Sequence, residues 1–217
     1  MHTLKKIISY FFEIKLQNIE SIQSGRMTIS LHKGQLKLST EKVIYSYGKN
    51  YGSFKYAFKK TNVENLNIKK VLILGAGLGS IIQLLENNKN IEKIVAIDND
   101  EVIIKAAKEY LKSSLNEKTF WQQVDAFEFI KTNSEKFDLI LFDVFVHEIT
   151  PSNFLTDKFL QLVKSKLNQS GILVFSKMDT DYKLKEENKL FEKQFSAIFP
   201  KNTKLTFSGN KLLIGYF

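Results

Sequence analysis

The sequence contains no cysteine, and this absence excludes disulfide bonds, thiol nucleophiles and thiolate metal sites. Histidine is also scarce. The three histidines, His2, His32 and His147, are far apart along the chain, so no metal site built from histidine is expected. Only two of the 217 residues are proline and 43% are hydrophobic, which is typical of a globular protein rather than a disordered one.

No apolar run reaches the ~20 residues that a membrane-spanning helix needs. The apolar stretch 7–12 near the start is short and is followed by Glu13 and Lys15. It also lacks a cleavage site of small residues, so a signal peptide is not predicted. We therefore expect a cytoplasmic protein without a membrane partner.

Arginine is nearly absent, although the net charge is +9. Arg26 is the single arginine, and the lysines are spread over almost every segment. Proteins that read nucleic acid rely on arginine for bidentate contacts, whereas scattered lysines are typical of a solvated surface. A small-molecule partner is therefore favoured. An RNA partner would require the lysines to gather around the mouth of the ligand site.

Residues 1–62 are expected to form a small N-terminal unit. Apolar residues within 3–16 recur at helical spacing, which predicts an amphipathic helix that packs on the rest of the chain or on a second subunit of a homodimer. From 26 to 47 apolar and polar residues alternate, which predicts a β-meander of three short strands. The aromatic-rich stretch 47–58 then either roofs a ligand site or forms an interface between two units.

Residues 63–217 are expected to form an α/β domain with a Rossmann-like, seven-stranded, mostly parallel sheet. Apolar strand patterns alternate with helical patterns, which predicts parallel strands covered on both faces. Strands are predicted at 71–74, 93–97, 119–124, 137–142 and 171–176, with helices at 79–88, 100–112, 126–132, 154–167 and 182–198. The patterns 203–207 and 212–217 are joined by a tight turn, so they must form an antiparallel hairpin.

The strand at 71–74 runs directly into a loop of three glycines at alternate positions, Gly75-Ala76-Gly77-Leu78-Gly79-Ser80. Such a loop turns tightly and lets a ligand lie against its backbone, while the first N–H groups of the next helix attract electronegative atoms. The spacing differs from the dinucleotide pattern G-x-G-x-x-G, which would need glycine in place of Ser80. Gly75, Ala76, Gly77 and Gly79 are therefore predicted ligand-binding residues.

Aspartates follow the next strands at the edge where ligands bind in parallel sheets. Asp98 lies about twenty residues beyond the loop, where a carboxylate accepts hydrogen bonds from ribose hydroxyls. The neighbours Asn99 and Asp100 are both able to cap the helix that follows, which leaves Asp98 free for a ligand.

Asp125 has two interpretations that remain open together. It accepts a hydrogen bond from an adenine amino group while the N–H of Ala126 donates to a ring nitrogen, or it caps the next helix. Asp143 is predicted to lie beside the glycine loop, where a group would be transferred. His147, four residues on, is the nearby side chain that titrates near neutral pH; it is either a base acting with Asp143 or Glu148, or an ordinary surface residue.

These stretches resemble the spermidine synthases and, more broadly, the spermidine-synthase-like branch of the class I S-adenosylmethionine-dependent methyltransferases. The resemblance covers roughly residues 25–200, and a terminal antiparallel hairpin is also typical of that fold. It implies binding of S-adenosylmethionine or its decarboxylated form without a metal. The glycine loop would lie against the amino-acid or aminopropyl portion, Asp98 and Asn99 in the ribose region, and Asp125 with Ala126 at the adenine.

The sequence departs from the aminopropyltransferases where they bind the acceptor. Leu78 stands where they carry an acidic residue in the glycine loop, and Val146 where they carry a second aspartate after the fourth strand. In the N-terminal unit Tyr45 matches their tyrosine, whereas Lys42 stands at or near an acidic position. A diamine carries two positive charges that need carboxylates to offset their desolvation, so putrescine is not expected as the substrate.

The main hypothesis is therefore an S-adenosylmethionine-dependent methyltransferase with an unidentified acceptor. Its predicted catalytic residues are Asp143, His147 and Tyr45. Two alternatives remain open. One is an aminopropyltransferase, that is, a spermidine synthase that uses decarboxylated S-adenosylmethionine, and the other is a non-catalytic relative that binds a nucleoside.

Overall fold

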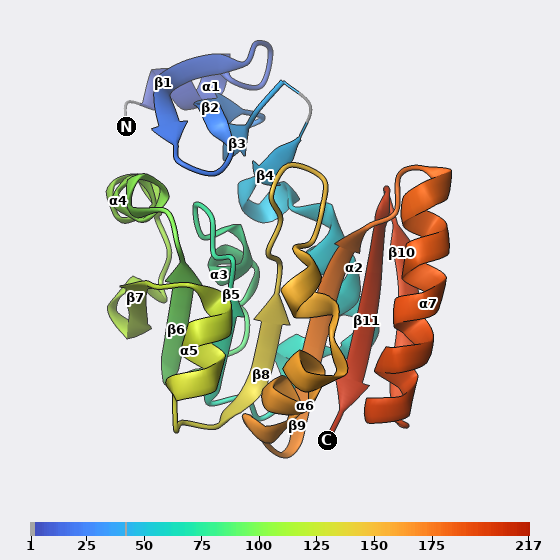
Figure 1. Cartoon of the computed structure of the whole chain (residues 1–217). Coiled ribbons are helices and arrows are strands. Elements are labelled where there is room, and N and C mark those ends of the chain that lie inside the picture. The colour runs from blue at the N-terminus through green and yellow to red at the C-terminus, as the bar shows by residue number, and fades with distance from the viewer. Residues whose placement is uncertain (1–2, 42) are drawn as a thin grey trace.

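A computed structural model describes residues 3–41 and 43–217 of the chain (Figure 1). Lys42, whose charge entered the expectation about the acceptor, lies outside the described residues. Within these ranges, no helix combines the length and the apolar character that crossing a bilayer requires.

A seven-stranded sheet forms the centre of the fold, in the order β10-β11-β9-β8-β5-β6-β7. Its strands are β5 (Lys70–Leu74), β6 (Lys93–Asp98), β7 (Thr119–Gln123), β8 (Phe137–Phe142), β9 (Leu167–Met178), β10 (Asn202–Phe207) and β11 (Asn210–Tyr216). Strands β5 to β9 pair in parallel, and β11 pairs antiparallel with both β9 and β10. The predicted fold class and its terminal hairpin are confirmed.

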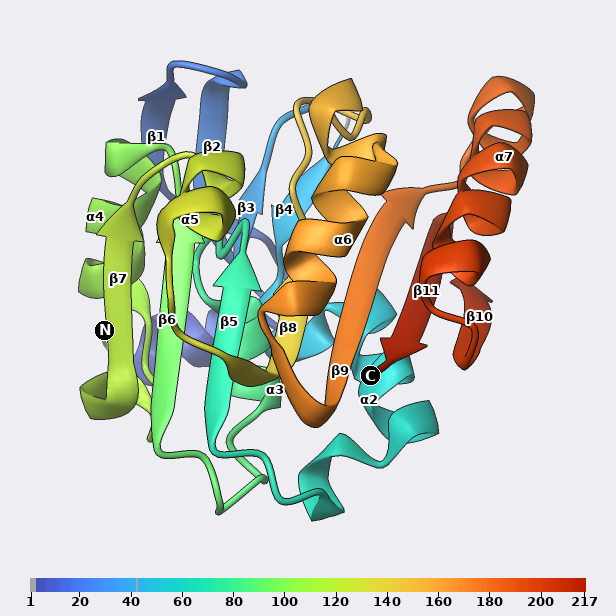
Figure 2. The same ribbon diagram turned by 60° about the horizontal axis from the view of Figure 1, so that its bottom comes forward.

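Helices cover both faces of this sheet, with α5 and α6 in front and α3 behind in Figure 2. The helices are α2 (Gly52–Thr61), α3 (Ser80–Leu84), α4 (Glu101–Tyr110), α5 (Ala126–Thr132), α6 (Asp157–Ser165) and α7 (Tyr182–Ile198). Short 3-10 turns are η1 (Gly48–Asn50), η2 (Val63–Asn65), η3 (Asn116–Lys118) and η4 (Ser152–Leu155). Each helix predicted in the α/β domain is present, although α3 ends at Leu84 rather than at residue 88.

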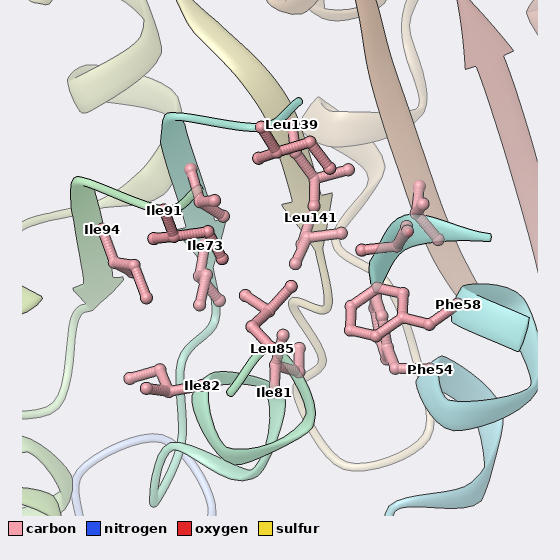
Figure 3. Close-up of a cluster of buried hydrophobic side chains, with 14 of the residues drawn as sticks. Phe54, Phe58, Ile73, Ile81, Ile82, Leu85, Ile91, Ile94, Leu139 and Leu141 are labelled. Carbon is pink, nitrogen blue, oxygen red and sulfur yellow. The ribbon is translucent and has the colours of Figure 1, made fainter. Parts of the chain in front are cut away.

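The apolar core lies on both faces of the sheet because successive strand residues point in opposite directions. Val71 and Ile73 of β5 pack in the cluster drawn in Figure 3, together with Phe54 and Phe58 of α2. Leu72, the residue between them, packs in a second cluster with side chains of α5, α6 and α7. Because α2 contributes to this core, the division of the chain at residue 62 stays a prediction.

The N-terminal unit is a four-stranded antiparallel sheet in the order β1-β2-β3-β4. Its strands are β1 (Ile14–Ser21), β2 (Gly25–His32), β3 (Gln35–Ser39) and β4 (Ile44–Ser46). The predicted three-stranded meander is present as β2 to β4. The helix predicted over 3–16 is wrong beyond Ile8, because α1 (Thr3–Ile8) ends there and residues 14–16 belong to β1.

The error arises because apolar residues at 14 and 16 fit a strand as well as a helix. In the structure β1 pairs with β2 along the strand, from Ile14 opposite Leu31 to Ser21 opposite Gly25. The apolar side chains of α1 stay largely exposed: Leu4 is 66%, Ile7 55% and Ile8 40% exposed. Packing of this helix on a second subunit stays a prediction.

Two contacts fasten the N-terminal sheet to the glycine loop. Leu78 of the loop is buried in an apolar cluster with Met27 and Ile29 of β2. The hydroxyl of Ser80 shares a hydrogen bond of 2.5 Å with the hydroxyl of Ser46 and accepts another, of 2.7 Å, from the backbone N–H of Tyr47. Ser80, the departure from the dinucleotide pattern, therefore joins the two parts of the chain.

Substitution Ser80→Ala is expected to lower the free energy of unfolding by about 1–2 kcal/mol, because it leaves the buried Ser46 hydroxyl and the Tyr47 N–H without this partner. Urea denaturation measures the change. Ser165→Ala is the matched control, since that exposed hydroxyl bonds only to the carbonyl of Leu162 in its own helix. Equal effects of the two substitutions would show that the Ser80 hydroxyl does not stabilise the junction.

Candidate functional site

A cavity of about 410 Å³ lies at the carboxyl ends of β5, β6, β7 and β8, at the edge of the sheet that faces the N-terminal unit (Figure 1). Four parts of the chain line it: the glycine loop with the strand ends, the loop after β8, the hairpin between β1 and β2, and strands β3 and β4. The lining includes Ser21, Gln23, Ser24, Tyr45, Gly75, Gly77, Asp98, Asn99, Asp100, Asp125, Ala126, Asp143, Phe145, Val146, Pro151 and Asn153.

The glycine loop follows the edge of the cavity closely. The N–H groups of Gly75 and Ala76 both donate to the carbonyl of Ile97, at 3.0 and 2.9 Å, so the loop folds back over β6. Gly75 has φ +82, and a Cβ there would collide with the main-chain carbonyl oxygen of Asp143. Of the predicted loop residues, Gly75 and Gly77 line the cavity.

The other two predicted loop residues lie beneath the cavity surface. Ala76 is buried in the apolar cluster of Figure 3, behind the loop. Gly79 precedes α3 with φ +81 and packs against Leu111. Both shape the loop rather than line its ligand-facing side.

Asp98 stands at the end of β6 with its carboxylate tied to two backbone groups. Its Oδ2 accepts a hydrogen bond from the N–H of Gly77 at 3.0 Å, and its Oδ1 accepts one from the N–H of Asp100 at 3.1 Å. Although part of the side chain is accessible from the cavity, burial raises the pKa of Asp98 to about 6, against the opposing effect of these hydrogen bonds. Asp98 does not cap α4, because the carboxylate of Asp100 accepts from the N–H of Val102 at 2.9 Å. The capping of this helix by Asp100 is confirmed.

Asp125 and Ala126 line the far end of the cavity at the start of α5. One oxygen of Asp125 accepts hydrogen bonds from the N–H groups of Phe127 at 2.9 Å and Glu128 at 3.1 Å. The capping interpretation of Asp125 is therefore confirmed, and a simultaneous role toward adenine stays a prediction.

The carboxylate of Asp143 is buried at the end of β8, with 8% of the residue exposed. The hydroxyl of Tyr51 donates to its Oδ2 at 2.6 Å. The buried Ser176 hydroxyl lies close enough to act on the carboxylate, but neither it nor Asp143 Oδ1 forms a hydrogen bond of good geometry with a described residue. Burial raises the pKa of Asp143 to about 7, and the neighbouring hydroxyls of Tyr51 and Ser176 act in the opposite direction. Burial beside this carboxylate also holds the pKa of Tyr51 well above its ordinary value.

Tyr45 and His147, the other predicted catalytic residues, have different positions. Tyr45 lines the cavity, and its hydroxyl donates to the main-chain carbonyl of His147 at 3.5 Å. His147 is exposed, with φ +56, at the tip of a turn closed by paired hydrogen bonds between Val146 and Ile149. Its side chain lines a separate surface pocket rather than the cavity. The geometry thus brings Tyr45 and Asp143 to one cavity but not the His147 side chain.

Two sets of lining or contacting residues were missed from the sequence. Tyr51 contacts Asp143 across 92 positions of the chain, and the sequence offered only its place in the aromatic stretch 47–58 as a signal. The hairpin residues at 21–24 were missed because no element was predicted for residues 17–25, where most of β1 and the hairpin lie.

The charge of the cavity is opposite to that of the protein. Among the described residues, its lining contains four aspartates, Asp98, Asp100, Asp125 and Asp143, and no lysine, arginine or histidine. The chain as a whole has a net charge of +9. No lysine among the described residues lines the cavity, and the preference for a small-molecule partner over RNA stays a prediction. The cavity is suited to a cationic small molecule.

Residues 56–208 match the family model of the spermine/spermidine synthase domain. Similar proteins include the polyamine aminopropyltransferase of Clostridium botulinum, 33% identical over 114 residues that cover 51% of this chain and 40% of that protein. The polyamine aminopropyltransferase of Saccharolobus solfataricus is 34% identical over 113 residues, which cover 49% of this chain and 38% of that protein. These matches span less than half the length of the curated relatives.

Solved structures show the same fold. A spermidine synthase in complex with the transition-state analogue AdoDATO has a TM-score of 0.73 at 19% identity, covering 94% of this chain and 73% of its own. The spermidine synthase of Thermotoga maritima has a TM-score of 0.70 at 20% identity, covering 94% and 72%. Human methyltransferase-like protein 13 in complex with SAH has a TM-score of 0.61 at 20% identity and covers 75% of this chain and 81% of its own.

Proposed function

Because the chain belongs to the spermine/spermidine synthase family, we propose that it transfers an aminopropyl group from decarboxylated S-adenosylmethionine to an amine. The resemblance found in the sequence is confirmed, but the main hypothesis of methyl transfer is not supported. The similar proteins are named polyamine aminopropyltransferases, which favours the alternative of aminopropyl transfer.

The observation that carries this proposal is the charge of the cavity lining. Four aspartates line it without any cationic side chain among the described residues. Decarboxylated S-adenosylmethionine presents a sulfonium and an ammonium, and both are attracted to carboxylates. S-adenosylmethionine adds a carboxylate, which would be repelled by the aspartates and has no cationic partner here.

The residues present fit such a donor. Each oxygen of Asp98 accepts one backbone hydrogen bond and keeps a further lone pair for a ribose hydroxyl. The backbone at Gly75 and Gly77 leaves room for the donor chain, and Asp125 with Ala126 lies where the adenine would reach. Asp143 Oδ1, a buried acceptor without a hydrogen bond among the described residues, is left for the amine of the acceptor.

When bound, the donor supplies a carbon that its sulfonium activates toward attack. The nitrogen of the acceptor forms a bond to that carbon while the carbon–sulfur bond breaks, and sulfur keeps the electron pair in methylthioadenosine. The nitrogen then loses one proton. Asp143 is the buried carboxylate nearest to neutral pKa in the cavity, so it is suited to orient the amine and accept this proton, with Tyr51 holding its other oxygen.

Decarboxylated S-adenosylmethionine is expected to bind at least about tenfold more tightly than S-adenosylmethionine, because only the latter places a carboxylate among the aspartates. Isothermal calorimetry at low salt measures both affinities. Methylthioadenosine, which lacks both charged groups, is the control for the nucleoside contacts, and Asp98→Asn should weaken all three ligands. Tighter binding of S-adenosylmethionine, with methyl transfer to an amine detected by mass spectrometry, would reject the proposal. Binding of methylthioadenosine alone, without turnover, would instead identify a non-catalytic relative.

A further inference from the structure

Among the residues that the structure describes, the wall of the cavity that remains for the acceptor carries no charged side chain. On the proposed function, the donor occupies the end formed by Asp98 and Asp125, and the transferred carbon lies near Asp143. An amine that displaces sulfur must attack from the side opposite the leaving group. The lining that is left for the acceptor includes the hairpin residues at 21–24, Tyr45 and the loop residues 144–146, together with Leu38, Pro151, Asn153 and Phe154.

These lining residues are neutral or apolar. The hairpin supplies Ser21, Gln23 and Ser24, and the loop after β8 supplies Phe145 and Val146. Asp143 is engaged at the point of transfer. The remaining lining aspartate, Asp100, caps α4 through Oδ1, and its Oδ2 is a buried atom.

Neighbouring charges do not compensate for this neutral wall. Leu78 is buried in the apolar cluster beneath the N-terminal sheet and does not line the cavity. Glu41 and Glu148 line the adjoining surface pocket, but Lys15 and Arg26 line the same pocket, so it brings no net negative charge. The hydrogen bond from the Tyr45 hydroxyl to the main-chain carbonyl of His147 joins a residue of the cavity to a residue of the surface pocket.

We propose that the acceptor is a primary monoamine with an uncharged tail rather than a diamine. The reactive amine needs one carboxylate, which Asp143 provides. A second ammonium group would lose its water against Val146 and the serine-lined hairpin without a counter-charge, which is costly. An alkyl tail instead meets Phe145 and Val146, and a terminal hydroxyl meets Ser24 or Gln23.

The test compares amines of equal chain length, namely putrescine, n-butylamine and 4-aminobutan-1-ol, with decarboxylated S-adenosylmethionine as donor. We expect the two monoamines to have kcat/KM values at least about tenfold above that of putrescine. Calorimetric titration of the same amines into the protein saturated with methylthioadenosine should give the same order of affinity. A preference for putrescine in both measurements would overturn this inference while supporting aminopropyl transfer. Transfer to no amine at all would overturn both.

A pair of variants separates charge from shape. Val146→Asp places a carboxylate on the neutral wall and should raise the kcat/KM of putrescine relative to n-butylamine by about tenfold or more. Val146→Asn, which has the same size but no charge, should leave the ratio unchanged. Equal ratios in the two variants, with both proteins folded by circular dichroism, would show that charge on this wall does not select the acceptor.

Discussion

Replacement of Asp143 by asparagine is expected to reduce kcat for aminopropyl transfer by about 10³-fold and, at the same time, to make the unliganded protein more stable at pH 8. The loss of activity follows from removing the carboxylate at the point of transfer. The gain in stability follows from removing a buried charge, because this carboxylate is enclosed with one oxygen unpartnered among the described residues. Asparagine keeps an oxygen that accepts from the Tyr51 hydroxyl.

The expected pH dependence follows from the pKa of Asp143, which burial raises from 3.8 to about 7. Between these two values the folded protein holds a proton that the unfolded chain has already lost. The free energy of unfolding therefore falls as pH rises through this window, by about 1.4 kcal/mol for each unit of difference in pKa, which is on the order of 4 kcal/mol in all. The asparagine side chain of the Asp143→Asn protein has no such proton to lose, so the free energy of unfolding of the variant does not decrease by this amount.

Urea denaturation of both proteins at pH 5 and pH 8, without ligand, measures the effect. Asp98, with its pKa raised to about 6, produces a smaller fall of the same direction in both proteins and does not obscure the difference. Asp125→Asn is the control, because asparagine caps a helix as well as aspartate does and this side chain is exposed. If the Asp143→Asn protein were the less stable one at pH 8, the carboxylate would have to be stabilised by contacts that the structure lacks.

Substitution Gly75→Ala is the second change with a large expected effect. A Cβ at this position collides with the backbone carbonyl of Asp143, and φ +82 is unfavourable for alanine. Neither the loop nor the end of β8 is free to give way, since the N–H of Asp143 donates to the carbonyl of Leu74 at 2.8 Å. We expect a loss of about 3 kcal/mol or more in the free energy of unfolding. Donor binding should be undetectable by calorimetry.

Gly25→Ala provides the matched control. Gly25 has φ +67, so alanine meets a similar backbone strain, but nothing lies within 4 Å of a Cβ there. This variant should lose only about 1–2 kcal/mol, the cost of the conformation itself, and should retain donor binding. The difference between the two glycines isolates the close approach of the loop to β8. Similar losses in both variants would show that this approach has no energetic importance.

The sequence predicted the α/β domain well because its local patterns and its tertiary environment agree. Residues 71–74 are apolar without interruption, and all four are buried because helices cover both faces of the sheet. The same agreement holds for the hairpin at 208–210, whose tight turn leaves a single way of pairing. In the N-terminal unit the local pattern and the tertiary environment do not agree. The segment 14–21 has apolar residues that fit two periods, and pairing with β2 decides between them.

The candidate site was predictable where it depends on strand ends and unpredictable where it depends on contacts between distant segments. Asp98, Asp125 and Asp143 follow strands, and parallel strands bring their carboxyl ends to one edge. The pairing of Tyr51 with Asp143 depends instead on how α2 packs behind the sheet, which no local pattern records. His147 was selected for its chemistry alone, and the turn that carries it directs its side chain to another pocket.

The hydrogen bonds between Ser80, Ser46 and Tyr47 have a consequence for local unfolding. Strand β4 contributes Ser46, and Ser80 is the first residue of α3, so β4 cannot separate from its place without freeing the end of the glycine loop. Segments linked in this way open as one cooperative unit. A ligand that stabilises the glycine loop therefore also stabilises the N-terminal sheet, which faces the same cavity.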